Sequence, residues 1–311
     1  MKILILGGFG FVGNRVRMAL QDSDHQTICF SRRNGLDLTD FDQTLKILKE
    51  IKPEAIINCA AHVGSVHYVT TYAAEVIHDN IQMALNLYKA VKEVCPKTRI
   101  INPLSNCSYP GEANIHFEPD WWKGEVHHSV YSYGNSKRMI YVLSHCYQKE
   151  YQIKSLNFLV PNTYGPGDST DPNKVHAING MIIRLIQAQR SREKEFEIWG
   201  SGKPIREWGY IDDVIYFLIK GLTIEEDLTY PVNIAQNRGY SIKESAEIIA
   251  EVVGYTGKLV FNTHFQDGAE FKILENTKFK KLFPGYTFFD FKKGIQETVN
   301  YYTHILGRQN L

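Results

Sequence analysis

The sequence lacks a dominant charge of either sign and any long hydrophobic run. Its 35 Lys and Arg residues stand against 34 Asp and Glu residues, which leaves a net charge of +1 over 311 residues. Proteins built mainly to bind nucleic acid usually carry a clear basic excess, so this class is excluded. No apolar run reaches the roughly 18 residues that a membrane-spanning helix needs, so we expect no membrane insertion.

Cysteine is also scarce, and its spacing argues against both disulfides and metal. The five cysteines are odd in number and show no CxxC pair. A chain of this length does not need disulfide staples, so we expect a reducing cytoplasm and no metal site. The apolar start, residues 1–12, has no small-residue cleavage site and is not expected to be a secretory signal.

The 43% hydrophobic and 22% charged composition is that of a globular protein, large enough for one domain or two that share a core. Its first half alternates strand-like with helix-like segments, which predicts a parallel sheet covered on both faces. The expected strands are 2–6, 27–30, 55–58, around 100–101 and 156–160, and the expected helices are 11–20, 41–51, 73–94 and 132–150.

The alternation stops after Val160, where prolines and glycines crowd a loop before a helix near 176–190. We therefore predict an α/β protein with a Rossmann-type doubly wound parallel sheet and a smaller α/β substrate-binding lobe. The nucleotide-binding domain is expected at residues 1–164, with 206–238 returning to it, and the lobe at 165–205 and 239–311.

A glycine-rich turn follows the first expected strand and opens the first expected helix. Gly7, Gly10 and Gly13 form GxxGxxG, a spacing that lets backbone N–H groups approach a diphosphate at the helix N-terminus. The alternative is a glycine-rich turn that binds nothing. The strand–turn–helix context favours a dinucleotide site.

The end of the second expected strand indicates which dinucleotide. NAD enzymes place an acid there for the ribose hydroxyls, whereas this chain has Arg32 and Arg33, which suit a 2′-phosphate. We therefore expect NADP(H), unless the two arginines are only a solvated pair. The predicted cofactor-binding residues are Gly7, Gly10, Phe11, Val12, Gly13, Arg15, Arg32, Arg33, Asp37, Leu38, Ala60, Ala61, Tyr133 and Lys137.

Tyr133 and Lys137 stand at i and i+4 of an expected helix and so face the same way. An ammonium beside a phenol should lower the pKa of the tyrosine and make it a usable proton donor to a carbonyl. YxxxK is common by chance, and alone it could be a surface pair. Here GxxGxxG, Asn58–Ala61 and Ser105 precede it in order, and the chain resembles the extended short-chain dehydrogenase/reductase superfamily. The resemblance implies a catalytic triad of Ser105, Tyr133 and Lys137.

Two further residues could move protons. Cys107 lies two positions after Ser105, on the same side of an expected extended segment, and His176 precedes an expected helix. A ketone acidifies the C–H bonds on both neighbouring carbons, and inverting such a carbon needs a base on one face and an acid on the other. Thiol and imidazole bracket neutral pH and suit these roles. Taken singly, each is more often structural.

Together, these motifs resemble the GDP-L-fucose synthase family over nearly the whole chain. The resemblance implies epimerisation by Cys107 and His176, with substrate-binding residues Asn162, His176, Arg184, Trp199, Arg206 and Lys272. It also implies a homodimer formed through helices 73–94 and 132–150. The chain departs from the family at His62, where a lysine is usual, at Ser65 and at Phe271.

The sequence therefore predicts an NADPH-dependent enzyme that epimerises a GDP-linked 4-keto sugar at C3 and C5 and then reduces C4. One alternative is a reductase of a GDP-4-keto-heptose or dideoxy sugar that does not epimerise. A second is an epimerase that retains NAD, which Arg32 and Arg33 disfavour. A third is a non-enzymatic NADP-binding module, against which the intact Ser105, Tyr133 and Lys137 argue.

Overall fold

A parallel sheet forms the centre of the molecule, as the alternating pattern predicts. The computed structural model describes residues 1–265 and 267–308. In that part of the chain the sheet has six strands, in the order β11-β6-β4-β3-β1-β2, and every neighbouring pair is parallel. Its strands are β1 (Lys2–Leu6), β2 (Gln26–Phe30), β3 (Ala55–Asn58), β4 (Arg99–Ser105), β6 (Ser155–Val160) and β11 (Val232–Asn233).

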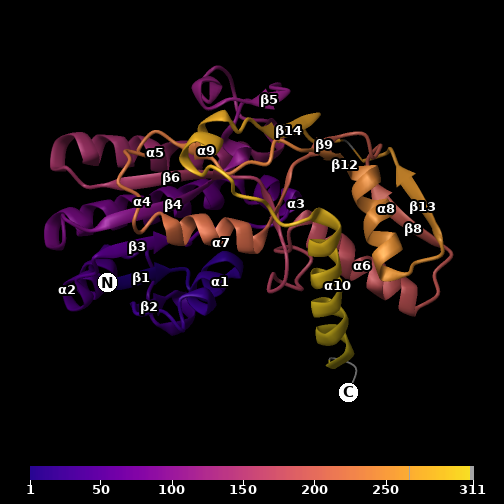
Figure 1. The fold of residues 1–311 in the computed structure, drawn as a ribbon, viewed down its shortest axis with the longest axis horizontal. Helices are drawn as coiled ribbons and strands as arrows, with labels where there is room; N and C mark the ends of the chain where they lie inside the picture. Colours follow the sequence, from indigo (N-terminus) through magenta and orange to yellow (C-terminus); the bar gives the residue numbers. More distant parts are fainter. Residues whose placement is uncertain (266, 309–311) are drawn as a thin grey trace.

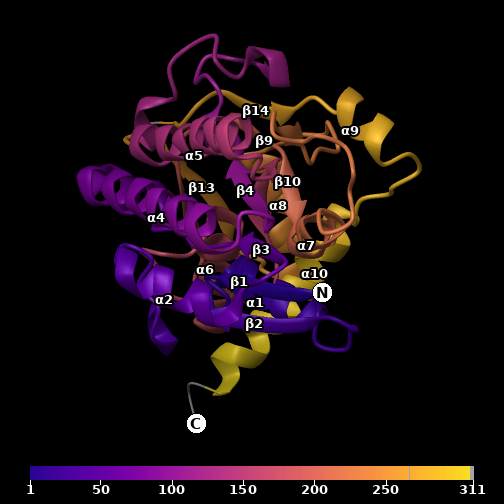
Figure 2. The same cartoon turned by 90° about the vertical axis from the view of Figure 1, so that its left-hand side faces the viewer.

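Helices cover both faces of this sheet. On one face α1 packs against α7, and on the other α4 lies between α2 and α5, side by side in Figure 2. Strands covered in this way are buried on both sides, which is why Ile3 to Leu6 are all at most 1% exposed. The Rossmann-type doubly wound fold is confirmed. The helices are α1 (Phe11–Ala19), α2 (Phe41–Ile51), α4 (Ala73–Val94), α5 (Tyr131–Tyr151) and α7 (Ile211–Lys220).

Local signals set the limits of these elements. The Asp40 side chain accepts a hydrogen bond from the backbone N–H of Gln43 at 3.0 Å and so begins α2. Lys52 ends that helix in the left-handed region, with φ at 47°, directly before Pro53. The bounds expected for α2, β3 and α4 agree with the structure.

The second region consists of small sheets and helices beside the main sheet, with α6, α8, α10, β8 and β13 on the right in Figure 1 and β5, β14 and α9 along the top. There β8 pairs with β13, β7 pairs with β10, and a mixed sheet runs in the order β12-β9-β14-β5. Helix α8 packs against α6 and α10. The strands are β5 (Ile115–His116), β7 (Asn162–Tyr164), β8 (Glu195–Trp199), β9 (Ile205–Arg206), β10 (Trp208–Tyr210), β12 (Tyr240–Ser241), β13 (Lys258–Asn262) and β14 (Phe271–Leu274). The helices are α6 (Ala177–Arg190), α8 (Ile242–Val253), α9 (Thr277–Leu282) and α10 (Phe291–Arg308).

Several short elements were not anticipated. A helix, α3 (Val66–Thr71), fills the stretch between β3 and α4, and 3-10 turns occur at η1 (Arg32–Asn34), η2 (Asn106–Ser108), η3 (Glu118–Asp120) and η4 (His128–Val130). Strand β4 extends to Ser105, well beyond the expected pair of isoleucines. Short β7 forms where only a loop was expected, since its partner β10 comes from a distant segment.

The strand order places a ligand-binding crevice between β1 and β3. From β1 the chain moves outward to β2, and from β2 it crosses back to β3 on the other side of β1. The loops that leave β1 and β3 therefore diverge to opposite faces of the sheet. Ligands of doubly wound sheets bind at this topological switch point, outside the carboxyl ends of the strands.

Candidate active site

The glycine-rich turn lies at the switch point and has no room for side chains. Gly7 has a φ of +70°, and a Cβ there would lie 2.7 Å from the backbone nitrogen of Ala60, in the loop after β3. A Cβ on Gly13 would collide with the carbonyl oxygen of Gly7. The turn is thus packed tightly against both the loop after β3 and the first turn of α1. Such close backbone packing is what a dinucleotide diphosphate requires.

The N-terminus of α1 is left open for an anion. Gly10 is the N-cap residue, and within the described residues no side chain caps the helix and no acid stands in its first turn, which contains Phe11 and Val12. The free N–H groups and the helix dipole favour a negative charge there. Arg15, one turn further, forms an ion pair with Asp212 of α7. A phosphate contact by Arg15 would therefore have to compete with this carboxylate.

Behind β2, the two arginines lie in the exposed turn η1, where the Ser31 side chain accepts a hydrogen bond from Arg33 N–H at 3.1 Å. Burial would raise the pKa of Asp37, but hydrogen bonds from Thr39 and the charge of Arg32 lower it overall. Leu38 is only 5% exposed and packs in the core beneath α4. Its backbone carbonyl accepts a hydrogen bond from Asn86 of α4 at 2.9 Å.

The residues of the expected triad lie on β4 and α5, two elements that pack against each other. Ser105 is the last residue of β4, while Tyr133 and Lys137 lie in the first two turns of α5, with the ammonium 5.3 Å from the centre of the phenol ring. Lys137 Nζ donates to the Pro103 carbonyl at 3.4 Å. Burial lowers the pKa of Lys137 to about 8, against an opposing effect of Cys59.

The expected effect of Lys137 on the tyrosine is wrong for this structure. Burial raises the pKa of Tyr133, and the neighbouring Cys107 raises it further. Burial, which disfavours the charged phenolate, is the larger of these two causes. The phenol therefore keeps its proton at neutral pH, as a proton donor must.

Cys107 does not lie on an extended segment, so the argument that placed it beside Ser105 is wrong in its geometry. The chain turns into η2 at this point, and Ser105 Oγ accepts a hydrogen bond from Cys107 N–H at 3.1 Å. The Cys107 thiol nevertheless reaches the site from this turn. Its Sγ lies 3.5 Å from Lys272 Nζ.

Two cations stand side by side next to this thiol. Lys272 of β14 is in register with Arg206 of β9, which brings the two side chains to adjacent positions of the small sheet. Burial lowers the pKa of Arg206, while Cys107 and Asp267 oppose that shift. Glu207, the next residue, is fully buried and accepts hydrogen bonds from three backbone N–H groups, which anchors the strand.

His176 is held by a carboxylate. It lies directly before α6, and Asp168 Oδ2 faces both its Nδ1, at 3.0 Å, and its backbone N–H, at 2.9 Å. Asn179 donates to the same oxygen at 2.9 Å. Burial would raise the pKa of Asp168, but these hydrogen bonds and the charge of His176 lower it. The imidazole lies 5.5 Å from the Phe11 ring, which connects it to the glycine-rich turn.

Three of the expected substrate-binding residues form hydrogen bonds with Glu197 or Glu207. Arg184 donates to the backbone oxygen of Glu197 at 3.5 Å, and Trp199 Nε1 donates to the carboxylate of the same residue at 3.0 Å. Trp199 is 58% exposed and stacks on Phe265 with ring centres 4.5 Å apart. Asn162 donates to the Glu207 carbonyl at 3.2 Å.

Sequence reasoning missed several residues that hold or line the site. Asp168 could have been suspected, because an acid eight residues before a candidate histidine is a plausible partner. His127 could not, since only the fold brings it near Lys272 and Arg206. Burial lowers the pKa of His127, and the charges of His128, Lys272 and Arg206 lower it further. Phe265 gave no signal at all.

The described residues contain neither a cluster that could hold a metal ion nor a helix that could span a membrane. Over residues 1–265 and 267–308, no three His, Cys, Asp or Glu side chains gather closely enough to hold a metal ion. Among the helices in the same residues, none combines the length and apolar character needed to cross a bilayer.

Comparison with known proteins identifies the family of this chain. The profile of the "NAD dependent epimerase/dehydratase family" matches residues 3–235. GDP-L-fucose synthase of Dictyostelium discoideum is 29% identical, with 96% of this chain and 94% of that protein covered. GDP-L-fucose synthase of Sinorhizobium fredii is 30% identical, with 89% and 88% covered. The GDP-mannoheptose C4 reductase MlghC of Campylobacter jejuni, solved with NADP bound, has a TM-score of 0.83 at 25% identity, with 97% and 98% covered.

Proposed function

Given that this chain belongs to the NAD dependent epimerase/dehydratase family, as a nucleotide-sugar enzyme of the extended short-chain dehydrogenase/reductase type, we propose that it epimerises a GDP-linked 4-keto sugar at C3 and C5 and reduces C4 with NADPH. The position of Cys107 supports this proposal most. Its backbone N–H is bonded to Ser105 on the reductive side, and its thiol touches Lys272 on the cationic side. A proton carrier thus stands between the two halves of the site.

The glycine-rich turn fits a dinucleotide. Backbone of the loop after β3 occupies the space beside Gly7 that a Cβ would need, and this close backbone packing is typical of turns that bind a diphosphate. The exposed Arg32 and Arg33 favour the 2′-phosphate of NADP(H), and the similar C4 reductase is named as NADP-bound. When bound, NADPH supplies the hydride for C4. Lys137 is buried, with its ammonium near the ring of Tyr133, and it would hold the nicotinamide ribose.

Reduction needs a proton on the ketone oxygen as its carbon accepts the hydride. Ser105 would orient that oxygen through its hydroxyl group, and Tyr133 would donate its phenolic proton to it, so that C=O becomes CH–OH. The raised pKa of Tyr133, caused by burial and by Cys107, keeps the phenol protonated until that moment. The proton lost by Tyr133 must be replaced from solvent before the next turnover.

Epimerisation would precede this step. A base removes the proton from the carbon beside the ketone, the C–H electron pair moves onto the ketone oxygen as an enolate, and an acid returns a proton to the opposite face. Cys107 and His176 would fill these roles, with Asp168 fixing the imidazole through Nδ1. The free Nε2 of His176 is then the atom that exchanges the proton.

The remaining groups would bind the nucleotide. Arg206 and Lys272, adjacent on β9 and β14, offer two positive charges to the diphosphate. Arg184 and the exposed Trp199 would contact the nucleoside, and Asn162 the sugar. We also propose a homodimer formed through α4 and α5, which pack against each other on one face of the sheet.

A reductase that does not epimerise is the second candidate. The observation in its favour is the similarity to the GDP-mannoheptose C4 reductase, at a TM-score of 0.83 over 97% of this chain. In that case Cys107 and His176 would only position the sugar.

An exchange experiment in D₂O separates the two candidates. Without NADPH, wild-type protein should incorporate deuterium at C3 and C5 of GDP-4-keto-6-deoxy-mannose, as followed by NMR. Cys107→Ser should slow this exchange by roughly 10²–10⁴-fold, the usual cost of losing an acid–base group, while NADPH binding stays unchanged. Cys146→Ser, at an exposed cysteine of α5, is the matched control. If wild-type protein oxidises NADPH but incorporates no deuterium, only the reductase candidate would remain.

A further inference from the structure

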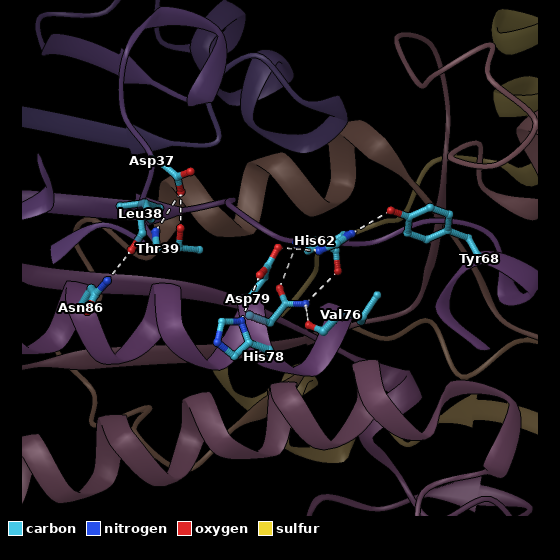
Figure 3. A network of polar contacts seen from close by, with 10 residues as sticks. Asp37, Leu38, Thr39, His62, Tyr68, Val76, His78, Asp79 and Asn86 are labelled. Carbon is cyan, nitrogen blue, oxygen red and sulfur yellow. Dashed lines mark hydrogen bonds and ion pairs between the residues drawn. The ribbon is translucent and has the colours of Figure 1, made fainter. Parts of the chain in front are cut away.

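Three polar side chains that the proposed chemistry does not use form a relay beside the site. Asp79 Oδ2 of α4 lies 2.8 Å from His62 Nδ1, and His62 Nε2 lies 2.8 Å from the hydroxyl of Tyr68. Figure 3 shows Asp79 and Tyr68 approaching the imidazole from opposite sides. The backbone of His62 is fixed as well, because Asn80 bonds both its N–H and its carbonyl, at 3.0 and 2.8 Å.

The relay has a defined direction. A carboxylate can only accept, so a neutral His62 carries its proton on Nδ1 toward Asp79 and offers Nε2 as an acceptor. The Tyr68 hydroxyl must then donate its proton to Nε2. Its oxygen lone pairs remain available, and the phenol can act toward another group only as an acceptor. A sugar hydroxyl is a donor of the matching kind.

Tyr68 packs on the same hydrophobic cluster as two residues of the proposed site. Its ring packs on a small hydrophobic cluster formed by Val69, Val76, Val126 and Val130, and Cys107 and Tyr133 pack on the same cluster. The phenol thus shares its surroundings with the proposed epimerising thiol and with the proposed proton donor.

The other edge of Tyr68 meets the segment that leads to His176. A Cβ on Gly64 would lie 2.7 Å from the Tyr68 ring and 2.6 Å from the Asn173 carbonyl oxygen. Ser65 N–H donates to that same carbonyl at 2.8 Å. Tyr68 therefore lies near the loop before His176 as well as against the cluster on which Cys107 packs.

We propose that Tyr68 accepts a hydrogen bond from a hydroxyl group of the sugar, with His62 and Asp79 as positioning residues that fix its polarity. This inference rests on the proposed function and adds a determinant of sugar selectivity to it. It assigns the relay no proton transfer: each proton stays on its own heavy atom. The lysine-to-histidine departure at position 62 then has a role, because a lysine has no acceptor to offer a phenol.

The test compares two phenol-to-phenyl changes on neighbouring rings. Tyr68→Phe keeps the ring and removes the hydroxyl. Tyr72→Phe is the matched control, since its ring lies 4.8 Å from that of Tyr68 and its hydroxyl has no hydrogen-bond partner within residues 1–265 and 267–308. For each variant, KM for a GDP-4-keto sugar, KM for NADPH, Kd for GDP and the thermal midpoint are measured.

We expect Tyr68→Phe to raise KM for the sugar nucleotide by about 2- to 10-fold, the range for one neutral hydrogen bond, with GDP and NADPH affinity unchanged. Tyr72→Phe should behave as wild type. Asp79→Ala should weaken sugar binding in the same direction as Tyr68→Phe, because without the carboxylate no group holds the His62 proton on Nδ1 and the Tyr68 hydroxyl loses its fixed direction.

A Tyr68→Phe variant with wild-type KM for the sugar nucleotide would overturn the inference. So would a variant whose GDP affinity and thermal midpoint fall together with its sugar affinity, since that pattern describes a structural anchor. Failure of the proposed function is seen separately, as wild-type protein that consumes no NADPH with any GDP-4-keto sugar, and it would overturn both.

Discussion

The cofactor cradle and the sugar pocket are built in opposite ways. The cradle is made of backbone, from loops that follow β1 and β3, and it works because Gly7 and Gly13 have no side chains there. The proposed sugar pocket is made of side chains from distant parts of the sequence, among them Ser105 at the end of β4 and Lys272 of β14. The cradle requires that side chains be absent, whereas the pocket requires particular side chains. Substitutions should therefore damage the two regions differently.

The largest effect is expected from removing one pocket group while the cradle stays intact. Tyr133→Phe should lower C4 reduction by roughly 10²–10⁴-fold, since it removes the general acid, and should leave NADPH affinity unchanged. Single-turnover reduction and NADPH titration measure the two quantities. Tyr131→Phe, an exposed tyrosine two residues earlier, is the control. Reduction at the wild-type rate would show that the triad is wrongly assigned.

Adding one atom to the cradle should have the next largest effect. Gly7→Ala places a Cβ 2.7 Å from backbone at a φ of +70°, which costs strain and displaces the loop after β3. We expect NADPH affinity to fall about 100-fold, as measured by fluorescence titration. Gly10→Ala meets its nearest atom at 3.4 Å and should cost much less. Equal losses in the two variants would contradict the close-approach argument.

Removing one cation of the pocket should affect only the nucleotide. Arg206→Ala or Lys272→Ala should each weaken GDP binding by about tenfold, because each removes a charge-assisted contact to the diphosphate. Calorimetry with GDP and with NADPH measures the difference, and the exposed Lys280→Ala is the control. Unchanged GDP affinity in both pocket variants would place the diphosphate elsewhere.

The smallest effect is expected at the rim of the cradle. Arg32 and Arg33 are exposed, so solvent and salt screen their contacts with a 2′-phosphate. Replacing both by Ala should raise KM for NADPH several-fold, leave KM for NADH unchanged, and act more weakly at high salt. Wild-type protein that uses NADH as well as NADPH would refute the basis of this prediction.

The sequence predicts the cradle well because its signals are local. A glycine pattern, a strand and a helix stand next to one another between residues 2 and 20, and the alternation of the first half leaves little choice of topology. The pocket depends on long-range pairing. Lys272 and Arg206 are in register on strands that lie far apart in the sequence, and no periodicity in the sequence predicts this register.

Burial is the other reason why the sequence does not predict every property of the site. From spacing alone, Lys137 should lower the pKa of Tyr133, yet the depth of the site reverses the direction. Spacing also cannot show that residues 106–108 coil into a turn, because the contact that holds the turn, from Cys107 N–H to Ser105 Oγ, forms only once β4 ends there. His127 and Tyr68 come near the proposed site only through contacts with residues of other elements or loops, and their identities alone give no hint of this.

The way β11 completes the central sheet has a consequence for the order in which the chain can fold during synthesis. The edge of β6 stays unpaired until Val232 and Asn233 have emerged from the ribosome, long after β6 itself. At about 5–20 residues per second, this leaves a nascent sheet with one bare parallel edge for roughly 4–14 s. Arg99 likewise cannot form its hydrogen bonds until the residues whose carbonyl groups accept them, Gly221, Leu222 and Ile224, have been synthesised. A fragment that stops near residue 164 would keep that edge open permanently, and we expect it to need a chaperone or to aggregate.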